Sequence, residues 1–264
     1  MSLIDRRVLM LSAAAAAAAS PVAGVPLPMK RCCPIVELRQ YTLRRDQRDV
    51  LIDLFDAQLI EPQEAVGARV IGQFRDLDDP DRFVWLRGFE SMETRAAALG
   101  AFYGGPVWAA HRQAANATMV DSDNVLLLHP AQAGQGFALP PNRSGAAGVV
   151  TATIRYVPPD LADMFAAFFE AQMRPHIEAA GARVLATFAS ETSPNTFPRL
   201  PIRSGDHVHI WFARFETAQA QQTFAERLAA VRGWRDQAPD ALLPALMRKP
   251  EVLRLAPTSR SLLR

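Results

Sequence analysis

The sequence of 264 residues lacks most of the features by which common protein classes are recognised. It has only two cysteines, Cys32 and Cys33. Adjacent cysteines strain a mutual disulfide and cannot alone form a structural zinc site, so we expect thiols without a framework role. The 29 basic and 27 acidic residues give a net charge of +2 and are spread along the chain. Because there is no basic stripe to follow a phosphate backbone, nucleic acid is not expected as a partner.

Recognised catalytic motifs are also absent from the sequence. It contains no glycine-rich phosphate loop, no Gly-x-Ser-x-Gly elbow and no Ser/His/Asp set that spacing would suggest. His207 and His209 alternate along an expected strand, a spacing that metal sites use, but only the distant His176 could join them. We therefore expect neither a metal centre nor a cofactor.

The first thirty residues differ from the rest of the chain. Arg6 and Arg7 precede an apolar run, Val8–Ala19, which is the layout of a secretory signal, and the paired arginines resemble a twin-arginine export motif. A run of about a dozen residues is short for a hydrocarbon core, so no stable membrane span is expected. We predict an export leader at residues 1–30 and a periplasmic protein. If translation starts at Met29, the alternative is a cytoplasmic protein.

An internal repeat organises the remaining sequence. The tetrapeptide Gly-Ala-Arg-Val at residues 67–70 recurs at residues 181–184, an offset of 114 (181 minus 67). Residues 85–90 (Trp-Leu-Arg-Gly-Phe-Glu) match residues 211–216 (Trp-Phe-Ala-Arg-Phe-Glu), an offset of 126 (211 minus 85). The second copy therefore carries 12 extra residues (126 minus 114), which fall in the segment 193–205.

Hydrophobic periodicity predicts the order β-α-β-β-α-β in both copies. The expected strands are 35–43, 70–74, 82–89 and 124–128 in the first copy, and 149–156, 183–188, 207–215 and 251–255 in the second. In the first copy Asp46 is expected to cap a helix that Gly67 ends, and a second helical stretch covers residues 92–115. Residues 131–148 are rich in Gly, Pro, Ala and Gln and are expected to be a linker.

The predicted fold class is α+β. Four antiparallel strands with both helices on one face leave an apolar sheet face exposed, which is costly unless a second copy covers it. Two modules, at residues 34–130 and 149–258, can pack face to face and enclose a cavity between their sheets. A tandem chain would make this pseudo-dimer by itself.

Three segments of the first copy resemble the NIPSNAP family. They are Val36–Leu43 (Val-Glu-Leu-Arg-Gln-Tyr-Thr-Leu), the Gly-Ala-Arg-Val-Ile-Gly-Gln-Phe segment that ends at Phe74, and Arg82–Arg87. In the second copy, residues 149–156 keep an Arg and a Tyr but lose the Glu. The resemblance implies two tandem ferredoxin-like modules that form an intramolecular dimeric α/β-barrel. Similar barrels include cofactor-independent monooxygenases and haem-binding enzymes, but the family's own activity is poorly defined and a fold does not transfer function.

Candidate ligand-binding residues lie on the first and third strands. Alternation places Glu37, Arg39 and Tyr41 on one face of the first strand, and Trp85 shares a face of the third strand with Phe83. If these faces line the cavity, Arg39 would bind an anionic or carbonyl oxygen while Tyr41 and Trp85 line an apolar pocket. The alternative is an ion pair between Glu37 and Arg39, with the aromatic side chains in the core.

Further candidates follow a Gly-Gly-Pro turn in the second helical stretch. Tyr103, Trp108, His111 and Asn116 are expected at the rim of the cavity, and a general base or metal ligand is one role for His111. A structural histidine is the other. In the second copy, His209 holds the strand position that matches Phe83 and is also a ligand-binding candidate.

These observations predict a NIPSNAP-like protein of undefined activity that binds a small apolar or aromatic molecule between its two sheets. The alternative is a cofactor-independent oxygenase-like or isomerase-like enzyme that uses the same cavity, with His111 and Tyr41 as candidate catalytic residues. A homodimer of the chain is a further hypothesis.

Overall fold

The computed structural model describes residues 31–231 and 236–264. The expected export leader at residues 1–30, with its paired arginines and Met29, lies outside the described residues. Within the described ranges, no helix is both long and apolar enough to cross a bilayer.

Two series of elements in the order β-α-β-β-α-β follow each other along the chain. The first, which we call the first half, contains β1 (Ile35–Leu43), α1 (Arg48–Leu54), a π-helical turn (Phe55–Leu59), α2 (Ile60–Ala65), β2 (Arg69–Asp76), β3 (Arg82–Phe89), α3 (Met92–Tyr103), α4 (Pro106–Thr118) and β4 (Met119–Pro130). The second half contains β5 (Val149–Tyr156), α5 (Ala162–Phe168), a π-helical turn (Phe169–Met173), α6 (Arg174–Ala179), β6 (Arg183–Ser190), β7 (Val208–Phe215), α7 (Ala218–Ala230), α8 (Leu243–Met247) and β8 (Glu251–Pro257). Short 3₁₀ turns precede α5 (Pro159–Leu161) and α8 (Asp240–Leu242).

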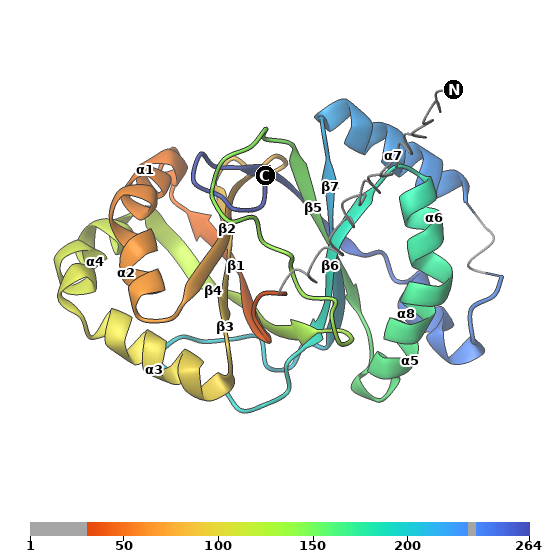
Figure 1. The fold of residues 1–264 in the computed structure, drawn as a ribbon, viewed down its shortest axis with the longest axis horizontal. Helices are drawn as coiled ribbons and strands as arrows, with labels where there is room; N and C mark the ends of the chain where they lie inside the picture. Colours follow the sequence, from red (N-terminus) through yellow and green to blue (C-terminus); the bar gives the residue numbers. More distant parts are fainter. Residues whose placement is uncertain (1–30, 232–235) are drawn as a thin grey trace, which may run out of the picture.

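The strands close one barrel in the order β1-β3-β2-β8-β5-β7-β6-β4. All neighbouring strands are antiparallel, and the two halves join along the β2–β8 and β4–β6 seams. Figure 1 shows the helices α1 to α4 on one outer side of the barrel and α5 to α8 on the opposite side. The fold is therefore α+β, built on a closed eight-stranded antiparallel barrel.

Apolar side chains fill the interior of this barrel. Val36 and Leu38 on β1 point inward. They pack in one cluster with residues from all seven of the remaining strands, β2 to β8. Phe137, from the segment expected to be a linker, is fully buried in the same cluster against Phe188 and Phe212. An eight-stranded barrel is just wide enough for side chains to fill it. The space between the two sheets, where a ligand cavity was expected, is filled by this packed core. That expectation was wrong.

The opposite faces of the strands carry the helices, and the connections differ in detail from the expectations. Asp46 does not cap the first helix: it adopts a left-handed conformation (φ 63°), and α1 starts after Gln47 without a side-chain cap. Gly67, with φ of 94°, follows α2 as expected. The stretch 92–115 is two helices, because Gly104 ends α3 and Pro106 occupies the first turn of α4.

The structure also differs from the expectations at the two cysteines and at the last strand of the first half. Cys32 and Cys33, expected as thiols, are joined to each other by a disulfide. The last strand of the first half, expected at residues 124–128, extends from Met119 to Pro130 and pairs with β1 along most of its length.

Candidate functional site

A buried charged network lies between the sheet and the helices of the first half. Glu37 on β1 binds three arginines, with N–O distances of 2.8 Å to Arg39, 2.7 Å to Arg87 and 2.7 Å to Arg95. All four side chains are at most 1% exposed. Burial alone would raise the pKa of Glu37, but the charges of Arg87, Arg39 and Arg95 outweigh it and hold the pKa well below the ordinary value. Glu37 is therefore a permanent carboxylate.

Three of the predicted ligand-binding residues contact one another at the edge of this network, namely Arg39, Tyr41 and Trp85. Arg39 Nε donates to the Tyr41 hydroxyl at 3.0 Å, and its guanidinium lies 5.4 Å and 5.6 Å from the ring centres of Tyr41 and Trp85. Tyr103 and Trp108 complete the aromatic group, with their rings 5.0 Å apart. The cavity that these aromatic residues line measures about 30 Å³, which is room for one water. The ion pair considered as the alternative is present, and the aromatic side chains are packed around it.

His111 and Asn116 do not join this group. His111 is half-buried on α4 and makes no hydrogen bond or ion pair with any described residue, and Asn116 is exposed. His207 lies just before β7 and His176 lies on α6, so the three histidines considered for a metal are not gathered. Within residues 31–231 and 236–264, no three His, Cys, Asp or Glu side chains form a group that could hold a metal ion.

The extra segment of the second half, residues 193–205, covers the charged network of the first half. Arg95 Nη1 donates to Asn195 Oδ1 at 3.0 Å and to Thr196 Oγ1 at 3.2 Å. The ring of Phe197 stacks on Tyr103 with the ring centres 6.0 Å apart. The network is therefore closed by a loop from the other half.

The two halves share one register. Ile35 pairs with Phe89 and Val149 pairs with Phe215, so β1 and β5 differ by 114 positions (149 minus 35) and β3 and β7 differ by 126 (215 minus 89). The N-caps of α3 and α7 also differ by 126 positions (217 minus 91). Residues at these offsets therefore hold corresponding places in the two halves.

The second half has shorter side chains where the first half has its network. The corresponding pairs are Glu37 and Thr151, Arg39 and Thr153, Arg87 and Ala213, Arg95 and Gln221, and Tyr103 and Ala229. The indole is kept, because Trp211 stands in the place of Trp85. The second half therefore loses four charges and much side-chain volume between its sheet and its helices.

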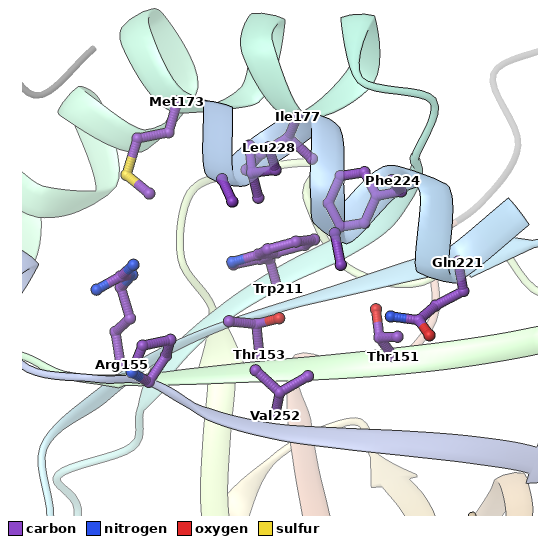
Figure 2. Close-up of a pocket in the computed structure, with 13 residues that line it drawn as sticks. Thr151, Thr153, Arg155, Met173, Ile177, Trp211, Gln221, Phe224, Leu228 and Val252 are labelled. Atoms are coloured by element: carbon purple, nitrogen blue, oxygen red, sulfur yellow. The ribbon is translucent and has the colours of Figure 1, made fainter. Parts of the chain in front are cut away.

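A cavity of about 280 Å³ occupies the space that these shorter side chains leave (Figure 2). Its floor is formed by β5, β7 and β8 and its roof by the π-helical turn, α6 and α7. The residues that line it are Thr151, Thr153, Arg155, Met173, Ile177, Trp211, Gln221, Phe224, Ala225, Leu228, Ala229, Pro250 and Val252. No acidic residue is among them. An apolar cavity of about 150 Å³ already holds benzene, so this cavity admits a larger molecule.

Polar groups are few in this cavity and most of them are buried. Trp211 Nε1 and Thr151 Oγ1 are buried and have no hydrogen-bond partner within the described ranges. Arg155 Nη1 donates to the backbone carbonyls of Leu246 at 3.2 Å and Arg248 at 3.4 Å, at the end of α8. Figure 2 shows the Arg155 guanidinium and the ring nitrogen of Trp211 at the same end of the cavity.

His209, which was expected to face a cavity between the two sheets, lies next to the second-half cavity and is not among the residues that line it. It pairs with Arg155 in the sheet and packs on the rings of Phe165 at 5.0 Å and Phe169 at 4.7 Å. Burial, with smaller effects from the charges of Arg155 and Arg174, lowers its pKa to about 3. The imidazole is therefore neutral at pH 7.

Most residues around this cavity were not predicted from the sequence. The available signal was the repeat itself: its offset of 114 positions places Thr151, Thr153 and Arg155 where the first copy has its conspicuous polar residues. The unusual residue types lie in the first half instead, where long side chains fill the corresponding space.

Comparisons with known proteins give a family match for the first half. A family model covers almost the whole first half. Residues 36–133 match the NIPSNAP family. A NIPSNAP-like domain protein from Burkholderia xenovorans is 28% identical to this chain, and its match covers 40% of this chain and 91% of that protein, with a TM-score of 0.36. No curated protein sequence matches the chain.

Beyond the NIPSNAP region, solved structures match most of the chain in fold. An anthrone oxidase-like protein aligns with a TM-score of 0.57 and 13% identity, covering 85% of this chain and 91% of its own. A candidate monooxygenase from Lactobacillus acidophilus NCFM aligns with a TM-score of 0.53 and 12% identity, covering 85% and 94%. At these identities the likeness shows a shared fold alone.

Proposed function

We propose that the protein binds a small, largely apolar aromatic molecule in the cavity of the second half. The cavity of about 280 Å³ between the sheet and α7 carries this proposal. Its walls include Trp211, Phe224, Leu228 and Ile177, and mostly apolar walls with a few polar groups are typical of small-molecule sites. The site therefore lies between one sheet and its helices rather than between the two sheets.

The comparison between halves supports a division of roles. The NIPSNAP region fills the corresponding space with the Glu37 network and leaves about 30 Å³, which is too little for an aromatic ring. We infer that the halves are tandem ferredoxin-like modules, residues 34–130 and 149–258 joined by residues 131–148, in an intramolecular dimeric α/β-barrel. The repeated element order and the shared register support this inference.

Blocking the cavity tests the proposed binding. Ala229→Tyr places in the second half the side chain that the first half has at Tyr103, and it should fill the cavity. We expect the purified wild-type chain to bind 2-ethylnaphthalene in calorimetry and to gain thermal stability from it, because a ligand that binds only the folded state stabilises that state. Ala229→Tyr should lose both effects. Ala230→Tyr, on an exposed neighbour outside the cavity, is the matched control and should keep them.

Two results would contradict the proposal. One is a wild-type chain that binds neither 2-ethylnaphthalene nor related bicyclic aromatics. The other is an Ala229→Tyr variant that is folded and binds as tightly as the wild type, because the ligand would then lie elsewhere.

Oxygenation in the same cavity is a second candidate function. Two of the proteins that share most of the fold are named as an anthrone oxidase-like protein and a candidate monooxygenase, and these names suggest an oxygenation assay. Oxidation of anthrone to anthraquinone consumes dioxygen and releases water, so an oxygen electrode follows it. We expect the wild-type protein to raise dioxygen uptake above the uncatalysed rate. The Ala229→Tyr variant should not raise it. Equal uptake with and without the protein would leave binding as the function.

The cellular setting is a separate proposal based on the sequence. We propose export through the leader at residues 1–30 to the periplasm and assembly of a homodimer. Cell fractionation tests the first statement and light scattering of the purified chain tests the second. Recovery in the cytoplasm, or a monomeric mass, would contradict them.

A further inference from the structure

We infer that the ligand of the second-half cavity is an aromatic compound with a carbonyl or anionic oxygen, held at the end where Arg155 and Trp211 lie. This inference rests on the proposed function, since it describes the ligand of the same cavity. Its first support is the buried indole N–H of Trp211, which has no acceptor among the described residues.

The indole N–H of Trp211 lies at this end of the cavity. Trp211 is 3% exposed, and its Nε1 has no hydrogen-bond partner in the part of the chain that the structure describes. A buried donor without an acceptor is costly, so a native structure that keeps one usually has a reason for it. Trp85 Nε1 also has no acceptor among the described residues, but the cavity beside it has room only for a water. At Trp211 the neighbouring space is large enough for a ligand to bring an acceptor oxygen.

Arg155 provides the positive charge at the same end of the cavity. Backbone carbonyls of α8 fix its Nη1, with distances of 3.2 Å to Leu246 and 3.4 Å to Arg248, so the guanidinium is held in place beside the space. The corresponding residue of the first half is Tyr41, by the offset of 114 (155 minus 41). The second half therefore has a guanidinium where the first half has a phenol.

The charged groups near this end include no negative charge that points into the cavity from the lining residues. His209 is neutral at pH 7, because its pKa is about 3. Arg174 is held by Glu170 at 2.6 Å and by Glu178 at 3.5 Å. Among the described residues, no carboxylate lines the cavity. An oxygen that carries negative charge is therefore stabilised near Arg155, and charge-assisted hydrogen bonds are the stronger kind.

The rest of the cavity suits an aromatic body. The side chains of Ile177, Phe224 and Leu228 lie above Trp211 in Figure 2, and Thr153 and Val252 lie below it. A flat ring system between these walls would direct a substituent towards Arg155. The arrangement separates an apolar compartment from a single polar end.

Three probes that share one naphthalene ring test the inference by calorimetry. They are 2-naphthoate, 2-acetylnaphthalene and 2-ethylnaphthalene, which carry an anionic oxygen, a carbonyl oxygen and no oxygen. A hydrogen bond to a charged group predicts about 10- to 100-fold tighter binding of 2-naphthoate than of 2-ethylnaphthalene. 2-Acetylnaphthalene should lie between them.

Two variants locate the effect. Arg155→Met should remove most of the preference for 2-naphthoate and leave binding of 2-ethylnaphthalene nearly unchanged. Trp211→Phe should reduce binding of 2-naphthoate and 2-acetylnaphthalene, because it removes the N–H and keeps an aromatic wall. Trp85→Phe is the matched control at the corresponding place of the first half and should bind all three probes as the wild type does.

The outcomes separate this inference from the proposed function. Equal affinity of the wild type for all three probes would overturn the inference while binding in the cavity stands. Failure of every probe to bind would instead overturn the proposed function. If Arg155→Met does not fold, Trp211→Phe and the order of the three probes still decide, and a Trp211→Phe variant with an unchanged probe preference counts against the inference.

Discussion

Replacing Glu37 by glutamine should destabilise the protein strongly. The substitution keeps the shape of the side chain but leaves three buried guanidinium groups, within 2.8 Å of the Glu37 oxygens in the wild type, without their counter-charge. Removing one partner of a buried ion pair costs about 3–5 kcal/mol. For a chain of this size each kcal/mol lowers the melting temperature by roughly 2–4 °C, so we expect a decrease of about 6–20 °C.

Urea unfolding followed by circular dichroism measures this loss. Thr151→Val, at the corresponding place of the second half, is the matched control and should change the free energy of unfolding by less than about 1 kcal/mol. The difference in the free energy of unfolding between the wild type and Glu37→Gln should also become smaller in acid. The pKa of Glu37 is lowered by folding, so its stabilisation is present above the unfolded value of about 4.3 and is lost as the pH falls, by roughly 2 kcal/mol between pH 7 and pH 3.

Two results would refute this reasoning. A Glu37→Gln variant within about 1 kcal/mol of the wild type would mean that the network contributes little. A difference between variant and wild type that stays constant from pH 7 to pH 3 would mean that the lost stability does not come from the carboxylate charge.

Two further predictions concern His209 and Phe137. Because burial lowers the pKa of His209 to about 3, its contribution to stability is present above the unfolded value of about 6.5 and is lost as the pH falls towards 3; between pH 7 and pH 5 the loss is about 2 kcal/mol. Urea midpoints at both values should show a smaller loss in His209→Phe, which copies Phe83 of the first half, and an equal loss contradicts the burial argument. Phe137→Ala opens a space between Phe188 and Phe212 and should lower the free energy of unfolding by about 3–5 kcal/mol. A loss below 1 kcal/mol in urea titrations would contradict its place in the barrel interior.

The sequence predicted the fold class because its repeat and its periodicities agreed. Alternation along residues 35–43 correctly put Glu37, Arg39 and Tyr41 on one face of a strand. It did not say which face points into the barrel, since a period of two distinguishes faces without ordering them. The structure gives the interior to the face of Val36 and Leu38, which also carries the buried Gln40, and the face of Glu37 meets the helices.

The candidate site was predicted only in part, because a cavity arises from missing volume. The residues selected as candidates from the sequence, such as Arg39 and Trp108, have large side chains, and large side chains fill space. Thr153 and Ala229 were not selected, and yet their small size opens the second-half cavity. Such a site becomes visible only when the two copies are compared position by position at the offsets of 114 and 126, and the sequence does not say which strand face meets the helices.

Long-range packing was equally hidden from the sequence. The segment 193–205 was visible as an insertion in the repeat, but its destination was not. Its residues Asn195 and Thr196 bind Arg95, about a hundred positions away, because the β4–β6 seam brings the two halves together. Local sequence signals cannot specify such a contact.

A barrel closed within one chain has a consequence for how its two sites can change. In a symmetric dimer each mutation occurs twice, so both sites must tolerate the same residue. Here a mutation alters only one side of the barrel. One side can therefore exchange its free space for a charged, rigid interior while the other keeps an opening and acquires its own chemistry. The joined chain allows specialisation that two identical subunits could not reach.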